Sequence, residues 1–396
     1  MHSISNTITR RLALFSARQS STTTTTSRSI LPLIAPPTTS LFSSPSRTIR
    51  SRSYAMASNS AAWLTAAKSP AFEVKEAPLW TAEAGEILVE NKAVAINPVD
   101  GSLQAFAWWP MNYPTVLGQD VAGVVVSVGS GVTRFKKGDR VVGHALGMAT
   151  KRDQDNAFQN YTILTQHMTS AIPDGISYES AAVIPLGCST AACGLFQDAP
   201  FLGLDYPTSP RRPANGKTIL VWGGSSSVGS NAIQLALAAG YDVLATASPK
   251  NFAYVKSLGA YAVVDYSSPS VEADLISALG GKTLAGVLDA IGGDATIVSS
   301  KVLAATAGAG RIATTKGAAD YTPPAGVEIK RIFGTTLANN AVGAAIYESF
   351  LPAALAAGTF VPSPQPEVTG SGLGAVQGAV DAIMKGVSAK KLVVTL

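Results

Sequence analysis

The stretch LVWGGSSSVGSNAIQLA, residues 220–236, constrains the fold of this 396-residue chain more than any other segment. An apolar strand leads into a loop of glycine and serine, and a helix follows. A strand, a small-residue turn and a helix in this order place helix N-terminal amide groups where they can bind a phosphate. The turn itself does not end in Gly-Lys-Ser or Gly-Lys-Thr, which excludes a P-loop at this place. The context therefore predicts a dinucleotide-binding site.

The segments downstream of this turn alternate between strand and helix patterns. The sequence predicts strands that begin near Thr218, Tyr241, Tyr261, Ala285 and Gly310. Between them it predicts helices over 228–239, 250–258, 271–279 and 294–305. A sixth strand within 328–338 and an alanine-rich helix over about 340–357 are expected next. This alternation indicates an α/β fold with a doubly wound parallel sheet of the Rossmann type.

The chain before residue 190 has a different texture. Strands rich in valine and alanine are expected over 85–97, 121–129 and 138–145, and closely spaced glycines interrupt them. This pattern is typical of a small β-barrel and not of a parallel sheet. A proline-rich loop, 200–216, separates the two parts. The last segment, 390–396, is expected to form a strand that returns to the first part or lies at the edge of the parallel sheet.

The residues of the glycine- and serine-rich turn have separate expected roles. Gly223 and Gly224 allow the phosphate to approach closely, and Gly229 allows the helix to pack tightly on the strand. The expected cofactor contacts of the loop and the helix start also include Ser225, Ser226, Ser227 and Val228. We expect the three serine hydroxyls to donate hydrogen bonds to the pyrophosphate.

The second strand of the sheet indicates which dinucleotide is bound. Rossmann folds that prefer NAD place Asp or Glu about 20 residues after the turn, at the ribose 2′-hydroxyl. Here the strand ends in LATASPKNF, 244–252, without an acid. Ser248, Lys250 and Asn251, with Tyr266 after the third strand, are donors that suit a 2′-phosphate instead. The sequence therefore predicts NADPH as the cofactor.

The positive net charge of +5 is concentrated at the N-terminus. Residues 1–55 carry seven arginines and no lysine or acid, which leaves a net charge of −2 for 56–396. An acid-free start rich in Arg, Ser and Thr is typical of a mitochondrial transit peptide. The alternative is a disordered tail, with a cytoplasmic form that starts at Met56.

The rest of the composition narrows the class of partner. Residues 56–396 have no basic run suited to nucleic acid, so no nucleic-acid partner is expected. No membrane span is expected either, because the most apolar segments are suited to core helices. The two cysteines, Cys188 and Cys193, are too few for a disulfide framework or a tetrahedral sulfur site.

Six segments resemble the medium-chain dehydrogenase/reductase superfamily, from about residue 65 to the C-terminus. They are AINPVDGSLQ (95–104), YPTVLGQDVAGVVVSVGSGVTRFKKGDRVVG (113–143), AAVIPLGCSTAACGLF (181–196), GGSSSVGSNAIQLA (223–236), ATASPKNF (245–252) and KKLVVTL (390–396). The likeness is to the zinc-free quinone and enoyl reductases, especially fungal trans-acting enoyl reductases. It implies a GroES-like β-barrel substrate domain over 56–190 and a Rossmann domain over 191–345. The C-terminal part, 346–396, is then expected to return to the substrate domain.

The same resemblance implies that no metal is bound. The zinc alcohol dehydrogenases of the superfamily hold catalytic zinc through a Cys in the first segment and a Gly-His-Glu in the second. In this chain those places read Asn97 and Gly118-Gln119-Asp120, and 121–180 contains no cysteine for a structural zinc lobe. Without a metal to polarise an alcohol or a simple carbonyl, the favoured chemistry is hydride addition to a double bond that is already conjugated.

The resemblance also assigns residues around the reacting atoms. It places Asn97 and Thr190 near the nicotinamide, as candidate catalytic residues. The residues that it places along the cofactor on the sheet side include Ile291, Thr335 and Leu337.

The proton donor stays open in the sequence. Ser102 and Trp108 stand where enoyl reductases of the superfamily carry a lysine and a tyrosine, respectively, and Tyr113 is the nearest other phenol. Tyr113 is therefore a candidate donor, or a turn residue before a proline. Trp108 and Trp109, near Ser102, either wall an apolar substrate cleft or pack within the barrel.

Two functions follow from these patterns. The first is an NADPH-dependent, zinc-independent reductase of an activated double bond, such as an enone, a quinone or a 2-enoyl thioester. The second is an NADPH-binding protein that acts by interaction, because the lysine and tyrosine of the enoyl reductases are absent from their places. A small-molecule substrate is the expected partner, and the chain is expected to be either a monomer or a homodimer.

Overall fold

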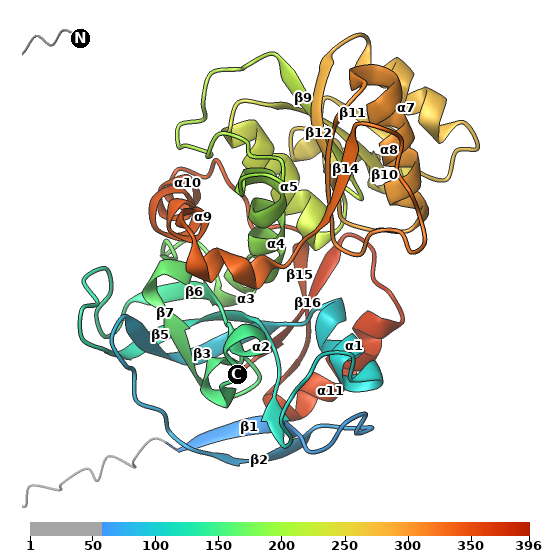
Figure 1. The fold of residues 1–396 in the computed structure, drawn as a ribbon. Helices are drawn as coiled ribbons and strands as arrows, with labels where there is room; N and C mark the ends of the chain where they lie inside the picture. The colour runs from blue at the N-terminus through green and yellow to red at the C-terminus, as the bar shows by residue number, and fades with distance from the viewer. Residues whose placement is uncertain (1–57) are drawn as a thin grey trace, which may run out of the picture. The chain divides into compact units, whose positions relative to one another are not determined.

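A computed structural model describes residues 58–396, and the expected transit peptide, 1–55, lies outside these residues. The second half of the chain contains a six-stranded parallel sheet in the order β11-β10-β9-β12-β13-β14 (Figure 1). This is the strand order 3-2-1-4-5-6 of doubly wound dinucleotide-binding folds, so the predicted Rossmann sheet is confirmed. The strands are β9 (Lys217–Trp222), β10 (Asp242–Ala247), β11 (Ala262–Asp265), β12 (Thr283–Asp289), β13 (Gly310–Thr314) and β14 (Val327–Arg331).

Helices cover both faces of this sheet, so successive residues of its central strand enter different cores. Ile219 and Val221 of β9 pack in the core that includes α4, α5 and α6, whereas Leu220 and Trp222 pack with α7 and α8. Figure 1 shows α4 and α5 on one side of the sheet and α7 and α8 on the other. Burial on both faces explains why the central strand β9 is an uninterrupted apolar run from Ile219 to Trp222. The helices are α4 (Pro185–Phe196), α5 (Ser227–Ala238), α6 (Phe252–Ser257), α7 (Val271–Leu279) and α8 (Asp294–Ala307).

The first part of the chain forms the predicted GroES-like domain, around a mixed sheet in the order β15-β16-β3-β5-β6-β8 with β7 also paired to β3. The strands expected over 85–97, 121–129 and 138–145 are β3, β5 and β6. A smaller sheet has the order β2-β1-β4. The strands of the two sheets are β1 (Asn59–Leu64), β2 (Glu73–Ala77), β3 (Glu86–Ala95), β4 (Thr115–Val116), β5 (Asp120–Val128), β6 (Arg140–His144), β7 (Tyr161–Thr165), β8 (Thr169–Ala171), β15 (Gln365–Ser371) and β16 (Lys390–Thr395).

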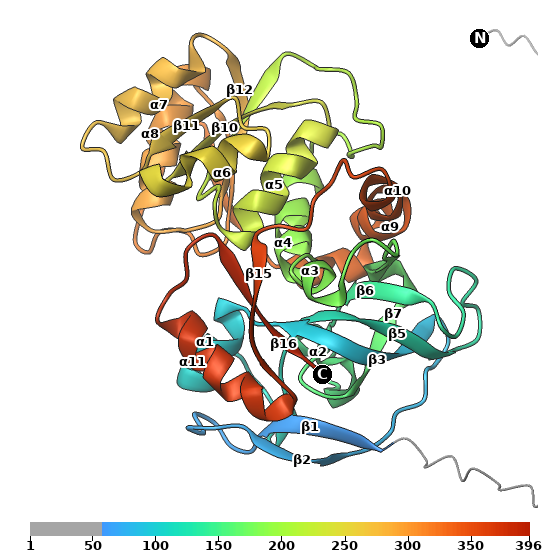
Figure 2. The same cartoon turned by 180° about the vertical axis from the view of Figure 1, so that it is seen from behind.

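The C-terminal strand returns to the first domain. β16 runs antiparallel to β3, with Val394 opposite Val94. The last segment therefore lies in the sheet of the substrate domain and not at the edge of the parallel sheet. Figures 1 and 2 show β15 and β16 with the substrate domain, their upper ends near the nucleotide-binding domain. The helix before β16, α11 (Val376–Met384), packs against α1 (Pro98–Phe106).

Several helices in and after the barrel region were not expected from the sequence. Besides α1 and the short α2 (Gly147–Thr150), they are α3 (Tyr178–Ala182) and α4. The segment Tyr178–Phe196 is long and apolar enough to cross a membrane by length and composition, but 83% of its 18-residue apolar window is buried. Its small residues explain the burial, because a Cβ on Gly187 would lie 2.4 Å from the Oγ atom of Ser227 in α5. The expected domain boundary at 190 falls within α4.

The alanine-rich helix expected over 340–357 is present in three parts. A π-helical segment, Ala345–Phe350, lies between α9 (Ala341–Ala344) and α10 (Leu351–Ala356). Its Tyr347 is wholly buried in the main core, and it belongs to the hydrogen-bonded chain described below.

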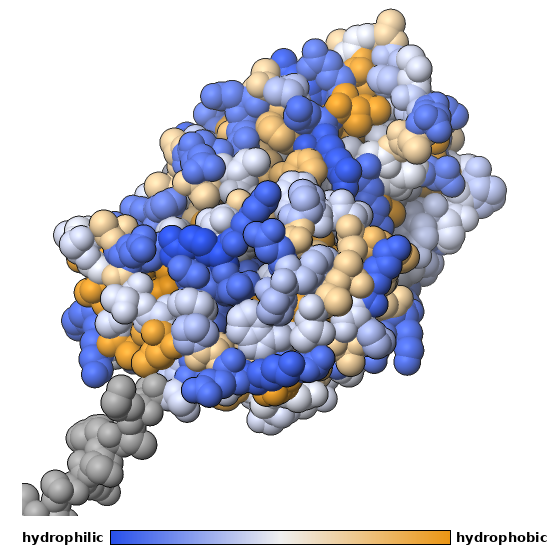
Figure 3. All heavy atoms as spheres, turned by 60° about the horizontal axis from the view of Figure 1, so that its bottom comes forward, coloured by the Kyte–Doolittle hydropathy of each residue, from blue (hydrophilic) through white to orange (hydrophobic). Residues whose placement is uncertain are grey.

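The surface of the molecule mixes polar and apolar side chains. Figure 3 shows hydrophilic and hydrophobic residues interspersed over the face that lies at the bottom of Figure 1. Within the described residues, the exposed large apolar side chains include Phe106, Trp108 and Met384, which belong to α1, the loop after it and α11.

Candidate active site

The glycine- and serine-rich turn joins the carboxyl end of β9 to α5, beside the point where the strand order reverses. Ligands of doubly wound sheets bind at this place. Gly223 has a φ of +83°, and a Cβ there would lie 2.8 Å from Cγ1 of Ile291. A Cβ on Gly229 would lie 2.2 Å from the carbonyl oxygen of Gly223. Only glycine therefore lets the helix approach the turn this closely, as the dinucleotide fingerprint requires.

The hydroxyl of Ser226 is used inside the turn. It donates to the carbonyl of Gly223 at 2.8 Å and accepts from the N–H of Gly229 at 3.0 Å, so it is the N-cap of α5. Its hydrogen is not directed to the cleft, in contrast to the expected donation to pyrophosphate. The amides of Ser227 and Val228 have no carbonyl partner within the helix and are the donors that the helix start offers a phosphate.

A cleft of about 700 Å³ opens beside the turn. Lys250, Lys390 and Lys391 line it, and none of its lining residues in the described chain is Asp or Glu. A cleft lined by one sign of charge attracts ligands of the opposite charge, here an anion. The structure brings most of the predicted cofactor residues together in this lining, namely Gly223, Ser225, Ser226, Ser227, Ser248, Lys250, Asn251, Tyr266 and Ile291.

Asn251 connects the segments that surround one end of the cleft. Its Nδ2 lies 3.3 Å from Ser225 Oγ, 3.2 Å from Ser248 Oγ and 3.1 Å from Ser388 Oγ. Lys250 is exposed next to this cluster, and no carboxylate pairs with it in residues 58–396. The cluster therefore offers an amide, hydroxyls and an unpaired cation to an anionic group.

The opposite wall of the cleft comes from the connection between α11 and β16, which sequence reasoning missed. This connection and the start of β16 contribute Gly386, Val387, Ser388, Ala389, Lys390 and Lys391. The pattern of the last segment predicted a strand, but it did not indicate which elements its two lysines would face. Pairing with β3 is what sets them across from the phosphate turn.

Lys391 belongs to a buried polar cluster at this wall. Its side chain is 3% exposed, and its Nζ lies 2.8 Å from Oδ2 of Asp120, which is wholly buried. The ammonium also donates to Oδ1 of Asn97, and Asn97 Nδ2 donates to Asp120 Oδ2 at 2.8 Å. The second Asp120 oxygen accepts from the N–H of Leu186 at 2.6 Å. Asn97 and Asp120, which belong to the two segments where the zinc enzymes of the superfamily hold their ligands, are therefore bridged by an ammonium group.

A second buried chain begins at Gln119. Its Oε1 lies 3.3 Å from Nε2 of His144, whose Nδ1 lies 2.9 Å from Oγ of Ser189. Ser189 in turn lies 2.7 Å from the hydroxyl of Tyr347, which donates to the carbonyl of Pro185 at 2.9 Å. Burial lowers the pKa of His144 to about 4, so the imidazole is neutral at physiological pH.

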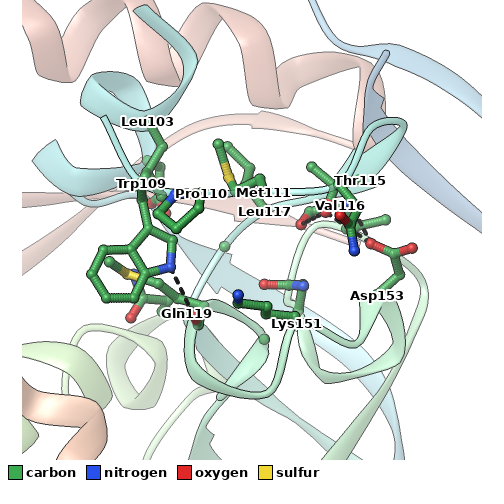
Figure 4. Close-up of a pocket in the computed structure, with 16 residues that line it drawn as sticks. Leu103, Trp109, Pro110, Met111, Thr115, Val116, Leu117, Gln119, Lys151 and Asp153 are labelled. Carbon is green, nitrogen blue, oxygen red and sulfur yellow. Dashed lines mark hydrogen bonds between the residues drawn. The ribbon is translucent and has the colours of Figure 1, made fainter. Parts of the chain in front are cut away.

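A smaller cavity of about 110 Å³ lies within the substrate domain (Figure 4). In this view Trp109 and Gln119 lie on one side, Thr115 and Asp153 on the other, and Lys151 reaches in between them. The cavity is lined by Asp100, Leu103, Trp109, Pro110, Met111, Asn112, Thr115, Val116, Leu117, Gly118, Gln119, Gly147, Met148, Lys151, Asp153 and Asn156.

The two neighbouring tryptophans have different environments. Trp109 donates its Nε1 hydrogen to the carbonyl of Met148 at 3.1 Å, and its ring lies 6.2 Å from that of Phe333. Trp108 is 41% exposed and donates to Oγ of Ser102 at 3.0 Å. Trp109 thus walls the small cavity, whereas Trp108 and Ser102 bond to each other outside the lining of either cavity.

The other predicted site residues are distributed as follows. Thr190 of α4 is 9% exposed and lies against the 3₁₀ helix Gly334–Asn339, because a Cβ on Gly334 would be 3.1 Å from its Oγ1. Thr335 is half-buried in that helix, but Leu337 is wholly buried in the main core. Tyr113 packs against the core of the substrate domain and lines neither cavity.

Comparison with known proteins gives the family. A model described as an alcohol dehydrogenase GroES-like domain matches residues 83–184, and one described as a zinc-binding dehydrogenase matches 227–353. The zinc-binding alcohol dehydrogenase domain-containing protein cipB of Emericella nidulans is 57% identical over 85% of this chain and 98% of its own length. The chain belongs to the medium-chain dehydrogenase/reductase superfamily. It is a dehydrogenase/reductase of this superfamily, whose members use NAD(P)H.

Other members of the superfamily show how far the likeness extends. The trans-enoyl reductase himH of Aspergillus japonicus is 38% identical over 85% of this chain and 97% of its own. An alcohol dehydrogenase superfamily protein of Novosphingobium aromaticivorans has a TM-score of 0.70 at 25% identity, over 85% of this chain and 99% of that one. A mycobacterial protein complexed with NADPH shares the fold, with a TM-score of 0.64 at 22% identity over 85% of this chain and 100% of that one.

The donor set at the place of catalytic zinc is poor in metal ligands. Within the described residues, no three side chains of His, Cys, Asp or Glu converge as a metal site would require. Cys188 and Cys193 are buried in α4, and burial raises the pKa of both thiols, which disfavours the thiolate that binds zinc. The Asp120 carboxylate is already occupied by Lys391, Asn97 and a backbone amide.

Proposed function

We propose that this protein is an NADPH-dependent reductase that delivers hydride to a conjugated carbon–carbon double bond without a metal ion. The observation that carries the proposal is the lining of the nucleotide cleft. Lys250 and the polar cluster at the end of β10 stand where an NAD-preferring enzyme places a carboxylate. The structure of the mycobacterial relative with NADPH supports the same choice of cofactor.

The residues of the cleft have defined roles in this proposal. The amides at the start of α5 bind the pyrophosphate, and Ser248, Lys250 and Asn251 bind the 2′-phosphate. Asn97 and Thr190 flank the place for the nicotinamide, at the meeting of the two domains. The reduced nicotinamide supplies the hydride, and the protein binds and orients both reactants.

The choice of acceptor follows from the cluster around Asp120. A metal ion would polarise a simple carbonyl or an alcohol oxygen as a Lewis acid, but here the ammonium of Lys391 occupies the carboxylate. A conjugated acceptor needs less activation, because its enolate is stabilised by a few hydrogen bonds. The name of the himH relative, a trans-enoyl reductase, supports this substrate class.

The test is NADPH oxidation by the purified protein with enones, quinones and enoyl thioesters, each with and without a chelator. Turnover of conjugated acceptors that a chelator leaves unchanged is the expected result. Chelator-sensitive oxidation of simple alcohols would contradict metal-independence. Tight NADPH binding without turnover of any acceptor would instead support a protein that acts by interaction.

The cofactor assignment has its own test in the Lys250→Ala variant. Loss of a charge-assisted contact of about 1.5 kcal/mol should weaken NADPH binding about 10-fold in calorimetry and leave NADH binding unchanged. Lys256→Ala, at an exposed lysine of α6 outside the cleft lining, is the matched control. Equal weakening of NADPH and NADH by the Lys250 variant would contradict a 2′-phosphate site.

A further inference from the structure

Asp289, the last residue of β12, carries a buried carboxylate that the proposed function does not use. Its side chain is wholly buried, and no ammonium or guanidinium group pairs with it within residues 58–396. A buried charge without a counter-charge is costly unless hydrogen bonds compensate it. The groups that donate hydrogen bonds to this carboxylate therefore indicate what it holds in place.

Four donors occupy the two oxygens of the Asp289 carboxylate. Oδ1 accepts from the backbone N–H groups of Ile291 and Gly292, both at 2.9 Å. Oδ2 accepts from the hydroxyl of Thr296 in α8 and from that of Thr314 in β13, the latter at 2.9 Å. A carboxylate has about four acceptor sites, so its capacity is fully used. One oxygen binds the framework of the domain, and the other binds the loop that follows β12.

The loop that Oδ1 binds has few other contacts to fix its shape. Ile291 is 47% exposed and belongs to none of the apolar cores of the described residues. It is followed by Gly292 and Gly293, whose φ angles are +85° and +63°, and glycine leaves the backbone free to adopt other conformations. The two hydrogen bonds to Asp289 therefore hold the backbone at Ile291, and with it the direction of the Ile291 side chain.

Ile291 lies in the nucleotide cleft, directly over the phosphate turn. It lines the cleft, and a Cβ on Gly223 would lie 2.8 Å from its Cγ1 atom. In the parallel sheet, β10 and β11, which precede the proposed 2′-phosphate site, lie on one side of β9, and β12 lies on the other. A dinucleotide with its pyrophosphate at the turn and its 2′-phosphate beyond β10 has its nicotinamide half on the side of Ile291.

We propose that Asp289 is a positioning residue, which holds Ile291 as a fixed apolar wall for the nicotinamide half of the cofactor. The inference rests on the proposed function and deepens it, because it names the group that orients the reacting half of NADPH. Ile291 contacts the cofactor, and Asp289 acts through the loop alone. A wall that is held in place before binding loses less entropy when the cofactor binds than a mobile loop does, and the affinity is higher for that reason.

A double-variant cycle in calorimetry tests whether Asp289 acts through Ile291. Asp289→Ala removes the acceptor of both loop amides, and Ile291→Ala removes most of the apolar wall. Each variant should weaken the binding of NADP⁺ about 3- to 10-fold. The double variant should bind about as weakly as either single one, because a wall that has been removed cannot be misplaced. Losses that multiply in the double variant would overturn the inference.

Two comparisons separate positioning from a merely structural role. Adenosine 2′,5′-bisphosphate lacks the nicotinamide half, so all three variants should bind it as the unmodified protein does. Asp289→Asn keeps an oxygen that can accept from both loop amides, so it should restore most of the affinity for NADP⁺. Weaker binding of the bisphosphate by Asp289→Ala, or no rescue by Asp289→Asn, would contradict the positioning role. Asp294→Ala, at an exposed acid in the first turn of α8, is the control and should leave both affinities unchanged.

Hydrogen exchange of the unmodified protein gives a test that needs no variant. The amides of Ile291 and Gly292 belong to a loop, but their hydrogen bonds to the buried carboxylate should slow their exchange well below the rate of an unstructured peptide, with or without cofactor. Exchange at the unstructured rate would show that Asp289 does not hold the loop. This measurement decides the inference even if Asp289→Ala does not fold, as judged by circular dichroism.

The outcomes separate this inference from the proposed function. If the protein reduces conjugated acceptors with NADPH, but Asp289→Ala binds NADP⁺ as tightly as the unmodified protein, the positioning role alone is refuted. If the protein binds NADP⁺ but reduces no acceptor, the proposed reductase function fails, and the cycle still decides the role of Asp289. If the unmodified protein does not bind NADP⁺, both fail together.

Discussion

Replacing Lys391 by methionine tests how the wall of the nucleotide cleft is held. The lysine is 3% exposed, and its partner Asp120 is wholly buried, with 2.8 Å between Nζ and Oδ2. Methionine keeps an unbranched apolar side chain of similar size but removes the charge. The carboxylate is then left with the amides of Asn97 and Leu186 alone. Breaking a buried ion pair by removing one partner costs about 3–5 kcal/mol, and we expect the Lys391→Met variant to lose that much unfolding free energy.

Two further variants separate the loss of the pair from the loss of a lysine. Lys390→Met is the matched control, because the neighbouring Lys390 pairs with Glu367 and the two side chains are 57% and 44% exposed. An exposed pair contributes about 0–1 kcal/mol. The double variant Asp120→Asn with Lys391→Met removes both charges and keeps an acceptor for the backbone amide. It should recover most of the loss, because replacing both partners of a buried pair is often close to neutral.

Urea unfolding, followed by circular dichroism and tryptophan fluorescence, gives the three differences under one set of conditions. The expected order of stability is the unmodified protein and Lys390→Met together, the double variant slightly below, and Lys391→Met well below. If Lys391→Met is no less stable than Lys390→Met, the ammonium does not hold the wall. If the double variant is as unstable as the single one, the loss comes from packing and not from an unpaired carboxylate.

Three other predictions follow from single features of the chain. Gly229→Ala places a Cβ 2.2 Å from a backbone oxygen of the phosphate turn, so it should weaken NADPH binding at least 10-fold in calorimetry. The control is Gly378→Ala, where a Cβ meets nothing within 4 Å. It should keep the affinity for NADPH and gain up to about 1 kcal/mol of unfolding free energy. The pKa of His144 is lowered to about 4, so between about pH 6.5 and pH 4 the unfolded chain binds a proton that the folded chain does not. The contribution of His144 to stability is therefore full above about pH 6.5 and is lost as pH drops toward 4. In His144→Gln the fall of Tm over this range should be smaller, and an equal fall would contradict the prediction. Fluorescent fusions beginning at Met1 should locate to mitochondria and those beginning at Met56 to the cytosol, and identical cytosolic signals would refute the transit peptide.

The nucleotide-binding half could be predicted because its signals are local. The central strands there are buried on both faces and therefore read as short apolar runs, as the split of Ile219 and Leu220 of β9 between two cores illustrates. The expected helix over 271–279 has the same bounds as α7. Glycine at 229 could be assigned as well, because close packing of helix and turn admits no side chain.

The helix α4 was missed because its sequence carries no amphipathic pattern. In α4 every residue except Leu186 is buried, so polar and apolar faces do not alternate. Small residues such as Gly187 and Gly194, which read locally as interruptions, are the points where α4 meets neighbouring elements. The role of Ser226 was missed because a serine at this position can either cap the helix or donate a hydrogen bond to a phosphate, and the sequence is the same in both cases.

The polar cluster at the cleft wall could not be predicted, because its members lie far apart in the chain. Asn97 and Lys391 are 294 residues apart and meet only because β16 pairs with β3. This pairing has a chemical consequence for the proposed reaction. A metal ion at this place could accept an electron pair from a substrate oxygen, whereas an ammonium can only donate hydrogen bonds, and two of its three hydrogens are directed here to Asp120 and Asn97. The acceptor must then bring its own activation, and the conjugated double bond of the proposed substrate supplies it.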